Sequence, residues 1–108
     1  MKYSPDNKPI VFLDKWSVIA PSEPSWHDPY TAPEGLWVAL SGKVYAHPRH
    51  INGKQVCTSI LVGSKGREVE TNNTHYVLGK MDEGYEKWLE SEGIDIDFLN
   101  PVKLKKTP

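Results

Sequence analysis

The segment Leu36–Tyr45, with the sequence LWVALSGKVY, decides the fold prediction. Apolar residues alternate along it with period two, which places successive side chains on opposite faces of a strand. The pair Asn52-Gly53 follows, and both residue types tolerate the positive φ that hairpin turns require. A second alternating run extends from Val56 to Val62. The pattern therefore predicts an antiparallel hairpin at the centre of the chain.

Short strands are also expected on both sides of this hairpin. Upstream, the apolar run Ile10–Ile19 indicates a strand with a break at Asp14. Downstream, we expect strands over 68–71, 75–78 and 94–98, with turns at 63–66 and 72–73. Many short strands joined by tight turns predict an antiparallel β-meander that curls into a sheet or a small open barrel.

The period of the apolar residues changes towards the end of the chain. From Met81 to Leu89 they fall at helical spacing, which predicts one C-terminal amphipathic helix. Asp82 suits the N-cap position, and Gly93 suits the residue that follows the helix end. With this helix packed on the sheet, the expected fold class is α+β.

A chain of 108 residues is expected to form a single domain with one hydrophobic core. Three segments are predicted to lie outside that core: a flexible leader (1–9), a proline-rich loop (20–35) and a frayed basic tail (101–108).

Charge and cysteine content limit the class of protein. The net charge of -1 gives no overall field that would attract nucleic acid or an anionic membrane. The single Cys57 cannot close an intramolecular disulfide, which favours a reducing compartment. No apolar run has the length of a signal-peptide core or a membrane span. We therefore expect a cytoplasmic protein without membrane contact.

The densest polar cluster lies around the central hairpin. Its members are Lys43, Tyr45, His47, Arg49, His50 and Lys54. Cations and hydrogen-bond donors gathered at a loop bind phosphate- or carboxylate-bearing ligands, so these are candidate binding residues. The alternative is a solvated hairpin tip whose charges only keep the sheet edge soluble.

Hydroxyl and aromatic side chains supply further candidates. Thr58, Ser59 and Tyr76 are placed to line a polar pocket, although threonine is also a good strand former. Trp26 and Tyr30, in the proline-rich loop, are candidates for contact with a partner because aromatic residues are enriched at interfaces. The alternative is that the loop folds over the outer sheet face and buries them.

Metal and catalytic sites are not favoured by the spacing of their residue types. His47 and His50 lie three residues apart, but no cysteine pairs or helical histidine pairs typical of zinc sites occur. Cys57 with His47 as its base would form a nucleophile pair, yet Cys57 is expected mid-strand, away from groups that lower a thiol pKa. We therefore expect no metal, no cofactor and no catalytic residue.

Three segments together resemble a pattern found in a family of small uncharacterised proteins of bacteria and their phages. They are residues 40–49 (LSGKVYAHPR), 58–60 (TSI) and 76–79 (YVLG). The family has no settled activity, so the resemblance implies a context and no mechanism. The polar positions that it singles out are His47, Arg49, Thr58, Ser59 and Tyr76.

These observations predict a non-enzymatic binding protein. It would be a phage or mobile-element inhibitor of host defence that binds a host protein or sequesters a small anionic, nucleotide-like ligand. One alternative is a small-barrel nucleic-acid-binding module that uses Lys43, Arg49 and Lys54 on phosphates. Another is a hydrolase that depends on a histidine or the cysteine. The expected edge strand at 94–98 would also allow a homodimer.

Overall fold

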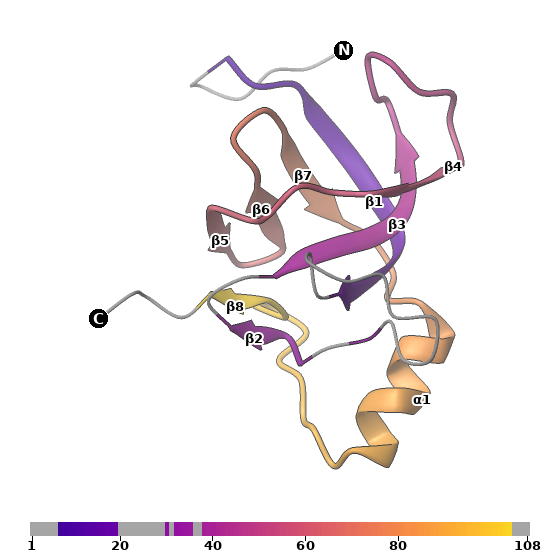
Figure 1. Cartoon of the computed structure of the whole chain (residues 1–108), viewed down its shortest axis with the longest axis vertical. Helices are drawn as coiled ribbons and strands as arrows, with labels where there is room; N and C mark the ends of the chain where they lie inside the picture. Colours follow the sequence, from indigo (N-terminus) through magenta and orange to yellow (C-terminus); the bar gives the residue numbers. More distant parts are fainter. Residues whose placement is uncertain (1–6, 20–29, 31, 36–37, 105–108) are drawn as a thin grey trace.

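Strand β1 (Ile10–Ile19) lies inside a six-stranded sheet in the computed structural model, which describes residues 7–19, 30, 32–35 and 38–104 (Figure 1). The strand order is β4-β3-β1-β7-β6-β5, and the sheet is not closed. The other five strands are β3 (Ala39–Tyr45), β4 (Lys54–Cys57), β5 (Gly63–Lys65), β6 (Glu68–Glu70) and β7 (His75–Leu78). With helix α1 (Glu83–Ser91) packed on this sheet, the predicted α+β class is confirmed.

Most strand pairs are antiparallel, as expected of a meander. β3 pairs antiparallel with β1 and β4, and β6 pairs antiparallel with β5 and β7. The pair that the sequence did not predict is β1–β7, which is parallel and places Val11 beside Tyr76 and Leu13 beside Leu78. β1 therefore joins the β3–β4 hairpin to the β5–β6–β7 meander, and its inward side chains are fully buried.

A bulge in β1 lies where the sequence predicts a break. The register with β3 shifts between Asp14 and Ser17, and Lys15 has a left-handed φ of 49°. Strict alternation after the buried Leu13 would point Lys15 inward and Trp16 outward. The extra residue reverses this order, because Lys15 is exposed and Trp16 is fully buried.

The connection between β4 and β5 bonds to both halves of the sheet. The strand expected up to Val62 ends at Cys57, so residues 58–62 are not part of a strand. Leu61 N donates to Val38 O (2.9 Å), just before β3, and Val62 N donates to Glu70 O in β6 (2.8 Å). Leu61 thus bonds to the β3 side of the sheet and Val62 to the β6 side. The two bonds draw these sides towards each other, so the sheet is curled like an open barrel (Figure 1).

Helix α1 begins and ends where the sequence predicts. Asp82 is the N-cap and accepts a hydrogen bond from Tyr85 N (3.1 Å), and Gly93 follows the helix with a φ of 67°. Tyr85 and Leu89 are buried, and the Tyr85 ring lies 6.2 Å from the Trp16 ring, centre to centre. This apolar side packs the helix against the core.

The edge strand expected at 94–98 is not formed, so that prediction is wrong. Ile94 and Ile96 are half-buried and pack against the core without a neighbouring strand. Residues 97–100 instead turn, with Leu99 N bonded to Asp97 Oδ1 (3.0 Å) and Asn100 N bonded to Asp97 O (3.0 Å). The homodimer hypothesis therefore has no support from this segment.

Both ends of the described chain are held more firmly than expected. In the predicted tail, Pro101 and Val102 are buried, and β8 (Lys103–Leu104) pairs in parallel with β2 (Glu34–Gly35). Residues 101–104 are therefore part of the packed fold. In the predicted leader, Lys8 Nζ contacts Glu70 Oε2 and Thr71 O, both at 2.9 Å.

Residues 1–6, 105–108 and most of the proline-rich loop, with Trp26, lie outside the described residues. Within the part of the chain that is described, no helix is long and apolar enough to cross a membrane.

Candidate functional site

The hairpin tip, residues 46–54, joins β3 to β4 and has a backbone fixed by its own bonds. Asn52 Oδ1 accepts from Ala46 N (2.9 Å), and Gly53 N donates to Val44 O (2.8 Å). Ala46 and Gly53 both have positive φ, of 62° and 86°. The Asn-Gly turn predicted from the sequence therefore presents the polar residues of the tip in one defined conformation.

Two histidine rings pack together at the tip. The rings of His47 and His50 lie 4.4 Å apart, centre to centre. Arg49 N donates to His47 Nδ1 (2.9 Å), which requires an unprotonated Nδ1. Partial burial lowers the pKa of His47, and the charges of His50 and Arg49 lower it further.

An exposed isoleucine stands among the cations of the tip. Ile51 is 81% exposed, which is more than any other large apolar side chain of the described residues. The tip also lines a shallow pocket of about 510 Å³. Its lining residues are Arg49, His50, Ile51, Asn52, Gly53 and Lys54.

A row of apolar side chains crosses the outer face of the sheet beside the tip. Phe12 pairs with Tyr45 on one side and with Val77 on the other, and paired residues face the same side of a sheet. Phe12 is 52% exposed and Tyr45 is 37% exposed. A Cβ atom at Gly53 would lie 3.8 Å from the Tyr45 hydroxyl, so this outer row reaches the hairpin tip.

The other predicted site residues do not join the tip. Thr58 Oγ1 accepts from Leu40 N in β3 (2.9 Å) and donates to Ser59 O (2.8 Å), so its hydroxyl bonds to the backbone. Tyr76 belongs to the buried core, and burial raises its pKa. Thr58 and Tyr76 are therefore separate from the polar residues of the tip.

Lys43 and Tyr30 line a second pocket, away from the hairpin tip. It has a volume of about 430 Å³ and lies on the outer side of β1 and β3. Tyr30 OH donates to Asp82 Oδ2 (3.0 Å), and its ring lies 5.2 Å from the Tyr85 ring, centre to centre. Tyr30 thus packs on α1.

The sheet register separates Cys57 from the hairpin tip. Cys57 pairs with Ser41, four residues before Tyr45, which corresponds to roughly 13 Å of strand. Cys57 is exposed on β4. In the described part of the chain, no three His, Cys, Asp or Glu side chains gather in a way that could hold a metal ion.

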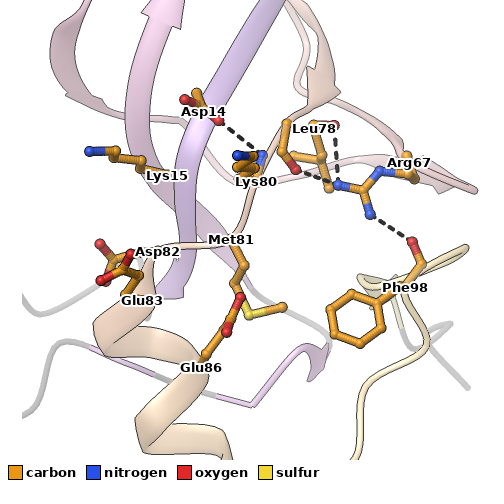
Figure 2. A pocket seen from close by; sticks show the side chains of 11 residues that line it. Asp14, Lys15, Arg67, Leu78, Lys80, Met81, Asp82, Glu83, Glu86 and Phe98 are labelled. Carbon is orange, nitrogen blue, oxygen red and sulfur yellow. Dashed lines mark hydrogen bonds between the residues drawn. The ribbon is translucent and has the colours of Figure 1, made fainter.

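A larger pocket, which we call the crevice, was not predicted from the sequence. It has a volume of about 940 Å³ and lies between the β1 bulge, the link from β7 to α1, and the turn at Phe98 (Figure 2). The residues that line it are Asp14, Lys15, Arg67, Leu78, Gly79, Lys80, Met81, Asp82, Glu83, Glu86 and Phe98.

The back of the crevice is fixed by backbone contacts at Gly79 and Lys80. Asp14 Oδ1 accepts from Lys80 N (2.9 Å), and Trp16 Nε1 donates to Gly79 O (3.1 Å). A Cβ atom at Gly79 would lie 2.7 Å from Asp14 Oδ1, so glycine permits this close approach. The break at Asp14 was the one sequence signal that pointed to this region.

Arg67 closes one side of the crevice. Its guanidinium donates to Phe98 O (2.6 Å), to Leu78 O (3.3 Å) and to Gly79 O. These bonds fix the turn at Phe98 against the end of β7, as Figure 2 shows. Sequence reasoning missed Arg67 because its partners are backbone carbonyls far away along the chain.

Comparison of the chain with protein-family models, with curated proteins and with solved structures finds no match.

Proposed function

We propose that this chain is a non-enzymatic binding protein that contacts a partner protein through the hairpin tip and the outer row. The observation that carries the proposal is Ile51, an 81% exposed isoleucine flanked by Arg49, His50 and Lys54 on a turn with a fixed backbone. Single exposed apolar residues are ordinary, but this one stands at the centre of a cationic, preorganised loop.

The chemistry of the tip defines the partner surface. Apolar anchors and arginines supply most of the binding energy at protein interfaces. A tip already held by the Asn52–Ala46 bond loses little conformational freedom on binding. The complementary surface is therefore an apolar hollow with an acidic rim, and Phe12 and Tyr45 extend the contact along the sheet.

In its more specific form, the proposal makes the partner a host defence protein and this chain a cytoplasmic inhibitor encoded by a phage or mobile element. The resemblance carried by residues 40–49 supports this form. An inhibitor of this kind acts by occupying a surface, which requires no catalytic group.

The test compares two tip variants with a matched control. Tagged wild type, Ile51→Asp, Arg49→Glu and Lys65→Glu are used to capture partners from the host, and captured proteins are quantified by mass spectrometry. Lys65 is exposed on β5, the sheet edge opposite β4, and its substitution reverses the same charge as Arg49→Glu.

A protein captured by wild type is then purified and its Kd is measured. We expect each tip variant to weaken binding at least about tenfold and the control to stay within about twofold. Equal binding by wild type and Ile51→Asp would contradict the proposal.

The pocket at the tip favours a second candidate, a small anionic ligand such as a nucleotide. Arg49 and Lys54 line it and supply charge-assisted donors for phosphate. Native mass spectrometry of the protein from host lysate would show a stoichiometric nucleotide-sized adduct that Arg49→Ala removes. An unliganded mass in the wild type would reject this candidate.

A further inference from the structure

The crevice combines two opposite charges with an apolar wall. Figure 2 shows Lys80 above Met81 and Glu86 below it, with the Phe98 ring across the space from all three. Lys80 belongs to the link from β7 to α1, and Glu86 lies on α1. The crevice is separate from the hairpin tip, which stands at the opposite end of the molecule from α1 (Figure 1).

Some charged groups of the crevice already have partners within the fold. Asp14 accepts from Lys80 N, Asp82 accepts from Tyr30 OH and Tyr85 N, and Arg67 donates to three carbonyls. Among the described residues, no hydrogen bond or ion pair engages the ammonium groups of Lys15 and Lys80 or the carboxylates of Glu83 and Glu86. Two cations, Lys15 and Lys80, and two carboxylates, Glu83 and Glu86, therefore remain for a ligand.

The apolar part of the crevice is fixed in an exposed position. The Phe98 side chain is 61% exposed, although Arg67 and the Asp97 turn hold its backbone. Met81 is nearly buried at the back of the crevice. A ring that is held in solvent beside a preformed cavity is a surface on which an apolar ligand group can pack.

Charge balance excludes ligands of a single sign. An anion without a cationic group would meet Glu83 and Glu86, and a cation without an anionic group would meet Lys80 and Lys15. A zwitterion with an apolar side chain satisfies both. The volume of about 940 Å³ exceeds that of a single amino acid and lies within the range of ordinary small-molecule sites.

We propose that the crevice binds a short peptide with free ends. The ammonium terminus lies at Glu86, with Glu83 beside it, and the terminal carboxylate lies at Lys80. An apolar side chain of the peptide packs against Phe98 and Met81. The β1 bulge, with the left-handed Lys15, shapes the edge of this site, as bulges do next to many binding sites.

The experiment uses the tripeptide Ala-Phe-Ala in four forms: with both ends free, acetylated at the N-terminus, amidated at the C-terminus, and blocked at both ends. Binding to the full chain is measured by NMR shift titration of the wild type and of the variants Glu86→Gln and Lys80→Gln. Glu90→Gln is the matched control, because Glu90 is an exposed carboxylate of the same helix that does not line the crevice.

The effect of each terminal modification on peptide binding should depend on one charged residue of the crevice. In the wild type and in Glu90→Gln, acetylation and amidation should each weaken binding about two- to fivefold, as expected for exposed ion pairs. In Glu86→Gln the effect of acetylation should disappear while that of amidation persists. In Lys80→Gln the reverse should hold, and shifted resonances should include those of Phe98 and Met81.

Two results would overturn the proposal. One is the absence of binding by all four forms, and the other is a loss in Glu86→Gln that is the same for free and acetylated peptide. Ile51→Asp should leave peptide binding unchanged, so failure of the crevice proposal and failure of the hairpin-tip proposal are distinguishable.

Discussion

At the scale of single residues, the surroundings of His47 favour its neutral form. The Nδ1 atom accepts a hydrogen bond from Arg49 N (2.9 Å), an acceptor role that protonation removes. Partial burial lowers the pKa of His47 from its usual 6.5, and the neighbouring His50 and Arg49 charges lower it further. The ring therefore stays uncharged in the folded state at a pH at which it is already protonated in the unfolded chain.

We expect the NMR titration of the His47 ring to give a pKa below 6.5. Because the folded state binds the proton less readily, stability from this group is present above pH 6.5 and is lost as the pH falls through the folded pKa. His50→Gln removes the second largest cause of the shift, so the pKa of His47 should move back towards its usual value.

His75→Gln, on β7 and away from the tip, is the control and should leave the His47 titration unchanged. A pKa of His47 at or above 6.5 in the wild type would show that the ring pair and the Arg49 bond do not persist in solution.

At the scale of elements, the start of α1 depends on one carboxylate. Asp82 Oδ2 accepts from Tyr85 N (3.1 Å) and from Tyr30 OH (3.0 Å). The cap therefore fixes both the first helical turn and the position of Tyr30. The N-cap preference for aspartate made this helix start predictable, whereas the second donor could be found only in the structure.

Asp82→Ala should lower the free energy of unfolding by about 1–2 kcal/mol, because the helix loses its N-cap and the Tyr30 hydroxyl loses the carboxylate that accepts its partly buried hydrogen bond. Asp82→Asn keeps an acceptor oxygen and should cost less. Denaturant unfolding with an unchanged m-value measures both, and Lys87→Ala, at an exposed helix position, should stay within about 0.5 kcal/mol. Equal losses for Asp82→Ala and Lys87→Ala would mean that the cap contributes nothing.

The predictability of an element depended on the number of independent signals it carried. α1 has an N-cap, helical spacing and a glycine after its end, and the structure confirms all three. Segments 94–98 and 58–62 carry only apolar alternation, and neither forms a strand. A bent chain that packs alternate side chains against a core produces the same alternation, so a short pattern cannot separate the two cases.

At the scale of the whole molecule, the connection at 58–62 ties together opposite sides of the sheet. Leu61 is buried and its amide bonds to Val38 O, while the next amide, of Val62, bonds to Glu70 O. These are long-range partners, so the connection contributes to the curvature of the entire sheet.

Leu61→Ala should lower the free energy of unfolding by about 2–5 kcal/mol through loss of a buried side chain. Val62→Ala, at a largely exposed neighbour, should change it by less than about 1 kcal/mol. In native-state hydrogen exchange, the amides of Leu61 and Val62 should exchange as slowly as those of β6. Fast exchange at both would show that the connection opens independently of the sheet.

The two candidate sites also differ in how far they could be predicted from the sequence. The hairpin tip is local, so its residues from His47 to Lys54 could be predicted from one stretch of sequence. The crevice is built from β1, the turn at Arg67, the end of β7 with α1, and Phe98. The surroundings of the hydroxyl residues Thr58 and Tyr76 were the least predictable, because they depend on packing with segments distant in the sequence.

The parallel pairing of β1 with β7 also has a consequence during synthesis on the ribosome. β1 leaves the ribosome well before β7, and its four large inward side chains, Val11, Leu13, Trp16 and Val18, find one of their two flanking strands only when His75–Leu78 has left the exit tunnel. Until then the nascent chain can form the β1–β3–β4 part alone, with one side of β1 unpaired. The core is therefore completed only after β7 has emerged, and until then the nascent chain is a natural client for chaperones that shield apolar strands.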